Sequence, residues 1–140
     1  MPIFVYGTLK KDRSNHDFLA GSRLIDKAVT LQAYGFYTGP DTQSPEGPSI
    51  PYLFEHPSEG DLPMKISGEV WEVDAITLSK LDKLEGHPDW YQRVQAPVKL
   101  DSGKKVFAQI YLMPGQPNPG LQVIASGCFQ FFLCLAALFI

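Results

Sequence analysis

The sequence predicts an α+β fold in which a small, mostly antiparallel sheet closes partly on itself and helices pack against it. Segments with strand character outnumber the helical segments, and the last two strand segments flank a short turn that is typical of a hairpin. Gly and Pro number twelve each, so short elements separated by many turns are expected. A chain of 140 residues is long enough for one domain with a hydrophobic core.

Four elements are predicted in the first half of the chain. They are a strand over residues 1–5, a short helix over 15–20, a strand region over 24–37 and a strand over 50–54. The segment 39–51 is rich in Gly, Pro and Ser and is predicted to be a loop. Because Pro51 has no N–H to donate to a neighbouring strand, the strand over 50–54 is predicted to lie at an edge.

The second half begins with a strand predicted over residues 66–73, followed by a helix over 75–85. Asp74 is the expected N-cap of this helix. Gly86 is expected to end it in a left-handed conformation, and Pro88 blocks its continuation. Two further strands follow as a hairpin, over residues 91–100 and 105–112.

Composition argues against several classes of function. The net charge is −3, and no run of Lys or Arg is present, so nucleic acid is not an expected partner. Cys128 and Cys134 match no zinc spacing and no C-x-x-C motif, and a reducing compartment fits them. The three histidines have no partner at a metal-binding spacing, so no metal is expected.

Glu85 stands out because an acid at the end of a helix faces the negative end of the helix dipole. An exposed carboxylate there is disfavoured by about 0.3–1 kcal/mol, and the same field would raise its pKa and make it a better base. An exposed side chain without a function is the alternative interpretation. The turn that ends the first strand, Tyr6-Gly7-Thr8, is the natural counterpart, because backbone N–H groups in such turns hold anions.

Five ordered pieces of sequence extend this observation to a family. They are Phe4-Val5-Tyr6-Gly7-Thr8-Leu9-Lys10, Asn15-His16, Ile50-Pro51, Gly68-Glu69-Val70-Trp71-Glu72-Val73-Asp74, and Leu81-Asp82-Lys83-Leu84-Glu85-Gly86-His87-Pro88 with Tyr91-Gln92-Arg93. At this spacing the chain resembles the gamma-glutamylcyclotransferase-like superfamily over residues 1–113, and within it the gamma-glutamylamine cyclotransferases.

The resemblance implies a small mixed, partly closed β-barrel with packed helices. It makes Tyr6, Gly7, Thr8 and Leu9 the substrate-binding loop and Glu85 the catalytic acid/base. Tyr6 could instead be a core aromatic at the end of the strand, and Thr8 could cap the turn. Tyr91 is interpreted as structural and expected to close onto the helix end, with Arg93 available to pair with a carboxylate.

The implied enzyme is a cofactor-independent gamma-glutamylamine cyclotransferase of the lyase or acyltransferase type. The α-amine of a gamma-glutamyl group attacks its own side-chain amide, giving 5-oxoproline and a free amine such as lysine from gamma-glutamyl-epsilon-lysine of degraded crosslinks. Because both reacting groups belong to one molecule, effective molarities on the order of 10⁵ M are accessible. Cyclotransfer on gamma-glutamyl amino acids or glutathione, and a non-catalytic ligand-binding relative, are the alternatives.

The end of the chain departs from the family. Residues 1–115 are predicted to form the cyclotransferase-like domain and residues 116–140 an atypical apolar tail. A membrane anchor over residues 121–140, a helix docked on the barrel, and an aberrant ending are three open interpretations of the tail. The expected location is the cytosol, with membrane association through the tail as the alternative. The N-terminus lacks the pattern of a signal peptide, and the sequence does not determine the oligomeric state.

Overall fold

A strand much longer than its neighbours, β2 (Arg23–Gly39), organises the fold of this protein. The computed structural model describes residues 1–7, 16–42, 45–126 and 128. The other elements are β1 (Pro2–Val5), a 3₁₀ helix η1 (His16–Leu19), β3 (Ile50–Phe54), β4 (Met64–Glu72), α1 (Ala75–Glu85), β5 (Gln92–Leu100), β6 (Lys105–Leu112) and β7 (Gln122–Val123). The predicted elements are therefore confirmed with small shifts of their ends, and β7 is additional.

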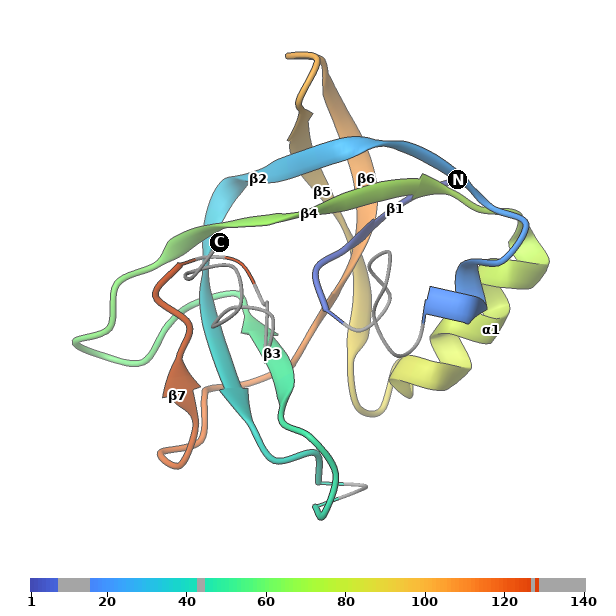
Figure 1. The fold of residues 1–140 in the computed structure, drawn as a ribbon. Coiled ribbons are helices and arrows are strands. Elements are labelled where there is room, and N and C mark those ends of the chain that lie inside the picture. The colour runs from blue at the N-terminus through green and yellow to red at the C-terminus, as the bar shows by residue number, and fades with distance from the viewer. Residues whose placement is uncertain (8–15, 43–44, 127, 129–140) are drawn as a thin grey trace, which may run out of the picture.

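Five strands close into a barrel in the order β2-β4-β1-β6-β5, with β5 returning to β2 (Figure 1). The pairing of β1 with β6 is parallel, and the other pairings of the barrel are antiparallel. Closure between β2 and β5 rests on three residue pairs, from Ala28↔Leu100 to Thr30↔Val98. The first half of β5 extends beyond this contact. Strands β2 and β5 therefore pair along only part of the barrel. The predicted small barrel is confirmed.

The second half of β2 leaves the barrel and forms a side sheet with β3 and β7 (Figure 1). The register against β4 shifts between Val29 and Ala33, where the chain changes direction. The buried Thr30 hydroxyl stabilises this shift by donating to the Gln32 carbonyl at 2.6 Å and accepting from the Ile66 N–H at 2.9 Å. Strand β3 pairs with β2 alone among the strands of the described residues, as expected for the edge strand predicted from Pro51.

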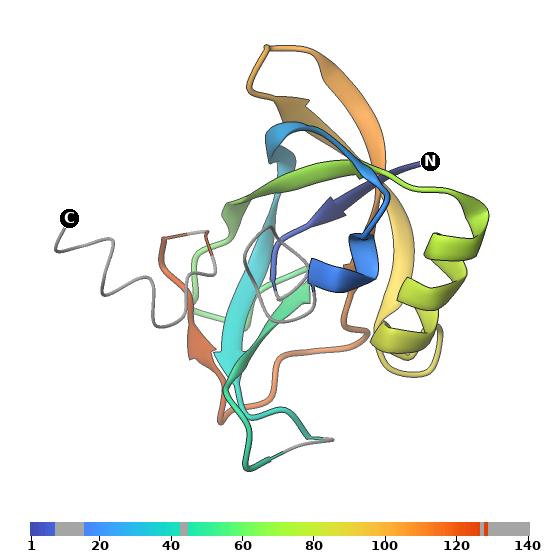
Figure 2. The same ribbon diagram turned by 45° about the vertical axis from the view of Figure 1, so that its right-hand side comes forward.

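Two hydrophobic cores lie on opposite faces of β1. Phe4 and Tyr6 point into the barrel, whereas Ile3 and Val5 belong to a second core that also contains Leu78 and Leu81 of α1. Alternate side chains of a strand face opposite sides, so one short strand serves both cores. Figure 2 shows η1 lying beside α1 on the outside of the barrel.

Helix α1 has the predicted bounds and the predicted caps. The Asp74 side chain accepts a hydrogen bond from the Thr77 N–H at 2.7 Å. Gly86 has a φ of 67°, in the left-handed region, and its N–H donates to the Lys83 carbonyl. The His87 N–H donates to the Asp82 carbonyl at 2.9 Å. Together these bonds form the Schellman arrangement, which ends the helix immediately after Glu85.

The beginning of the predicted tail contacts the side sheet. Strand β7 pairs with Tyr37 and Thr38 of β2, and the Ile124 N–H donates to the Phe36 carbonyl at 2.9 Å. Residue 127 and residues 129–140, including Cys134, lie outside the described part of the chain, so the three interpretations of the tail remain predictions. Within the described residues, no helix has the length and apolarity needed to cross a membrane.

Candidate active site

Glu85 is the last residue of α1, and Tyr6 and Gly7 follow the end of β1. The predicted loop residues Thr8 and Leu9 lie outside the described residues. Gly7 packs closely on the edge strand, because a Cβ atom at this position would lie 2.7 Å from Cγ of Pro51. Two of the family-like pieces, Tyr6-Gly7 and Ile50-Pro51, are therefore in direct contact although more than 40 residues separate them.

The hydroxyl groups of two buried tyrosines near Glu85 donate to backbone carbonyls. The Tyr6 hydroxyl donates to the Tyr111 carbonyl, and the Tyr91 hydroxyl donates to the Pro51 carbonyl, each at 2.6 Å. Burial raises the pKa of both tyrosines well above the usual value, and the negative charge of Glu85 raises it further. Both phenols are therefore neutral at physiological pH, and Tyr6, Tyr91 and Glu85 lie close enough to interact electrostatically.

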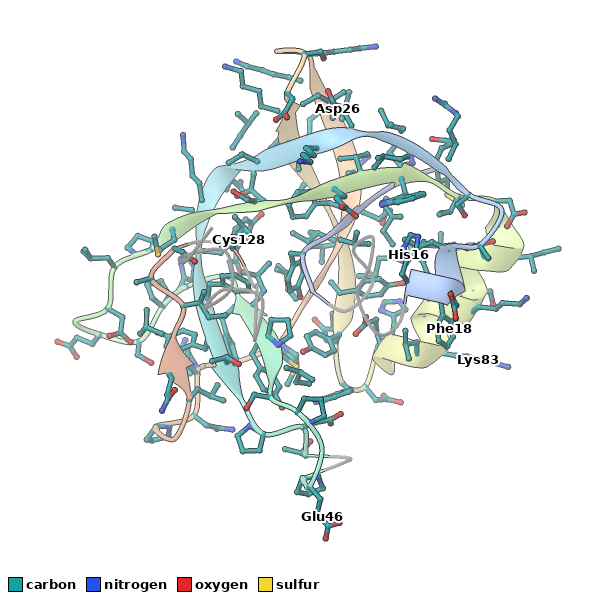
Figure 3. All side chains as sticks on the ribbon, viewed as in Figure 1. His16, Phe18, Asp26, Glu46, Lys83 and Cys128 are labelled. Carbon is teal, nitrogen blue, oxygen red and sulfur yellow. The ribbon has the colours of Figure 1, made fainter. Side chains whose placement is uncertain are left out.

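The Glu85 carboxyl titrates near neutrality. Burial, and to a smaller extent the negative charge of Asp41, raises its pKa from 4.5 to about 7. The direction agrees with the sequence argument, but the cause is burial and a neighbouring acid. The residue retains intermediate exposure, whereas Lys83 two positions earlier projects into solvent (Figure 3). A carboxyl with this pKa exchanges a proton readily at physiological pH, as acid–base chemistry requires.

An ion pair lies one helical turn before Glu85. Arg93 of β5 donates to both carboxylate oxygens of Asp82, at 2.8 and 3.2 Å, and Tyr111 of β6 donates to one of them at 2.7 Å. The expectation that Arg93 pairs with a carboxylate is confirmed. Tyr91 also contacts the helix end as expected, because its N–H donates to the Glu85 carbonyl at 3.1 Å.

Sequence reasoning missed two residues that interact electrostatically with Glu85, Tyr111 and Asp41, and it missed one contact of Pro51. Tyr111 lies inside an ordinary strand pattern. Asp41 lies in a loop that is predicted from its composition, which does not indicate where the side chains of the loop lie. The role of Pro51 as the acceptor for Tyr91 depends on a contact across 40 residues, which no local pattern reports. In the described part of the chain, no group of three or more His, Cys, Asp or Glu side chains is arranged to hold a metal ion.

The fold and the site together define a small α+β barrel protein. It carries a carboxyl group with a pKa of about 7 at the end of a packed helix. Residues 3–131 match the family described as gamma-glutamyl cyclotransferase, AIG2-like. The chain belongs to this family.

Relatives agree with this assignment. A protein of Methanocaldococcus jannaschii with the provisional name gamma-glutamylcyclotransferase is 40% identical over 113 residues, covering 80% of this chain and 83% of that protein. Gamma-glutamylaminecyclotransferase C of Danio rerio is 33% identical over 119 residues, covering 78% of this chain and 72% of that protein. The crystal structure of an AIG2-like protein from Mus musculus matches with a TM-score of 0.67 at 26% identity. The match covers 84% of this chain and 79% of the mouse protein.

Proposed function

We propose that this protein is a gamma-glutamylamine cyclotransferase, which releases 5-oxoproline and a free amine from gamma-glutamyl amines such as gamma-glutamyl-epsilon-lysine. The observation that carries the proposal is the Glu85 carboxyl, whose pKa of about 7 suits a residue that both accepts and returns a proton. Membership of the cyclotransferase family and similarity to proteins named gamma-glutamylaminecyclotransferase support the choice of substrate.

In the proposed reaction, ionised Glu85 removes a proton from the α-ammonium group of the substrate. The amine then attacks the side-chain amide carbon, a five-membered ring closes, and the carbonyl oxygen becomes an oxyanion. Backbone N–H groups of the loop from Tyr6 to Leu9 are proposed to hold the polar head of the gamma-glutamyl group and the oxyanion. Glu85 then gives this proton to the departing nitrogen as the C–N bond breaks, and the ring nitrogen, which still carries one proton too many after the attack, releases it to the Glu85 carboxylate or to solvent. The products are 5-oxoproline with one ring N–H and the free amine, which takes up the second proton as an ammonium group.

The test is a panel of substrates with the same gamma-glutamyl head and different leaving amines. Purified full-length protein is incubated with gamma-glutamyl-epsilon-lysine, gamma-glutamylalanine and glutathione, and 5-oxoproline is quantified. The proposal expects the highest kcat/KM for gamma-glutamyl-epsilon-lysine. Preference for a gamma-glutamyl amino acid or glutathione would instead support the second candidate function. That candidate is favoured by the 40% identity to the archaeal relative, whose name does not specify an amine.

The pH dependence of the reaction follows from the pKa of Glu85. Only the carboxylate form can accept the proton of the substrate, so kcat/KM should fall about tenfold per pH unit below an inflection near pH 7 and level off above it. Initial rates of 5-oxoproline release between pH 5 and pH 9 measure this profile. A profile that stays nearly flat down to pH 5, as expected for a Glu with the ordinary pKa of 4.5, would show that burial does not tune this group.

A further inference from the structure

The carboxylate of Asp82 ties the end of α1 to two strands of the barrel. It accepts two hydrogen bonds from the Arg93 guanidinium on β5, at 2.8 and 3.2 Å, and one from the Tyr111 hydroxyl on β6, at 2.7 Å. Arg93 is itself fixed by a hydrogen bond to the Gln109 side chain at 2.9 Å. We call Asp82, Arg93 and Tyr111 the Asp82 clamp.

Two backbone N–H groups hold the same helix end at Glu85 and just after it. The Arg93 N–H donates to Nδ1 of His87 at 3.0 Å, and the Tyr91 N–H donates to the Glu85 carbonyl at 3.1 Å. The chain around Glu85 is therefore attached to Tyr91 and to the start of β5 by bonds at Asp82, at Glu85 and at His87. A helix end held on both sides has little freedom to move its last side chain relative to the sheet.

Tyr111 also reaches the other half of the candidate site. Its side chain bonds to Asp82, and its backbone carbonyl accepts the Tyr6 hydroxyl at 2.6 Å. Both tyrosines are buried, with 3% and 7% of the surface of Tyr111 and Tyr6 exposed. One residue thus connects the helix that carries Glu85 to the loop that begins at Tyr6.

The ion pair is not explained by stability alone. The side chains of Arg93 and Asp82 are 24% and 21% exposed, and partly exposed ion pairs usually contribute only about 1 kcal/mol or less. A planar guanidinium that bonds both oxygens of a carboxylate does fix the geometry closely. Burial would raise the pKa of Asp82, but the bonds from Arg93 and Tyr111 lower it below the usual value, so the acceptor remains charged.

We propose that the Asp82 clamp positions Glu85 relative to Tyr6, so that Asp82, Arg93 and Tyr111 serve the reaction without touching the substrate. This inference rests on the proposed role of Glu85 as the acid/base. Catalysis of this kind is sensitive to placement, because a displacement of about 1 Å can lower a rate by up to about 10²-fold. Substrate binding depends less on the Glu85 position than proton transfer does.

Tyr111→Phe tests the clamp because it removes one hydroxyl and leaves the ring and the backbone carbonyl. We expect kcat for gamma-glutamyl-epsilon-lysine to fall about tenfold or more while KM changes less than about twofold. The matched control is Tyr37→Phe. Tyr37 is also 3% exposed and also donates to an aspartate at 2.7 Å, namely Asp61 in the loop between β3 and β4. Equal kcat values in the two variants would overturn the proposal.

Two further comparisons separate positioning from general loss of stability. Arg93→Lys keeps the charge but loses the two-oxygen contact, so it should lower kcat, whereas a charge effect alone would leave kcat unchanged. The double variant Asp82→Asn/Tyr111→Phe should be no slower than the slower single variant, because both changes disable one unit. Strictly additive losses would show two independent effects and contradict a single clamp.

Hydrogen exchange tests the clamp independently of turnover. The Tyr91 amide, which bonds to the Glu85 carbonyl, should exchange faster in Tyr111→Phe than in wild-type protein and should be unchanged in Tyr37→Phe. If the wild-type protein releases no 5-oxoproline, the proposed function fails, and these exchange rates still decide whether the clamp holds the helix end. Equal exchange in the two variants would contradict the clamp.

Discussion

Replacing Glu85 with glutamine should lower kcat for 5-oxoproline release by roughly 10²–10⁴-fold, the range expected when a general acid/base is removed. Glutamine has nearly the same shape as glutamate but cannot accept the ammonium proton of the substrate. The expected loss is mainly in kcat, because the proposed contacts of the gamma-glutamyl head with the loop from Tyr6 are retained. Initial rates of wild-type protein and Glu85→Gln with gamma-glutamyl-epsilon-lysine measure the effect.

The stability of the same variant shows whether the loss is chemical. Because the folded-state pKa of Glu85 is raised, the folded wild-type protein binds its proton more tightly than the unfolded chain does. Wild-type stability therefore falls as the pH rises from about 4.5 to about 7, whereas Glu85→Gln lacks this dependence. At pH 8 the variant should unfold at a temperature no lower than wild-type protein. Glu59→Gln, a change at an exposed loop residue, should leave kcat unchanged, and an equal loss there would refute the assignment.

Gly68→Ala should have the second large effect, on both stability and activity. A Cβ atom at Gly68 would lie 2.3 Å from the Val5 carbonyl oxygen and 2.7 Å from the Phe4 ring. The carbonyl belongs to the backbone, so β1 must shift away from β4, and the turn at Tyr6 and Gly7 must shift with it. We expect a loss of about 1–3 kcal/mol in the free energy of unfolding, measured by urea denaturation, and a lower kcat/KM.

Gly120→Ala is the control for this prediction. Among the described residues, no atom outside Gly120 and its two chain neighbours lies within 4 Å of a Cβ built at Gly120, so alanine should be accommodated without displacement. If Gly68→Ala were as stable and as active as Gly120→Ala, the close approach of β1 and β4 would not determine the position of the turn.

The local parts of the fold could be predicted because their causes are local. The bounds of α1 follow from the Asp74 side chain, which bonds three residues ahead, and from Gly86, which supports the left-handed ending. The last hairpin follows from two strand patterns around a short turn. These signals extend over a few residues and do not depend on the rest of the chain.

The dual role of β2 and the pairing of β7 could not be predicted in this way. Strand β2 serves the barrel with its first half and the side sheet with its second half, and the change occurs at a register shift near Thr30. Strand β7 has only two residues and is recognisable only through its partners in β2. Both features depend on non-local pairing, for which a single sequence carries little signal.

The candidate site shows the same division. Glu85 could be identified from its unfavourable position at a helix end and from the family-like motif around it. The partners around Glu85 could not be identified from the sequence. Tyr111 is 105 residues from Tyr6, whose hydroxyl donates to its carbonyl, and 29 residues from Asp82, to which it donates. The pKa of Glu85 also depends on burial and on Asp41, which become visible only when the chain is folded.

Product analysis tests the central proposal most directly. Full-length protein is incubated with gamma-glutamyl-epsilon-lysine at pH 8, where Glu85 is ionised, and 5-oxoproline, free lysine and free glutamate are quantified together. Intramolecular attack by the α-amine predicts 5-oxoproline and lysine in equal amounts without glutamate. Release of lysine with glutamate in place of 5-oxoproline would show that water is the nucleophile and would contradict the proposed cyclotransfer.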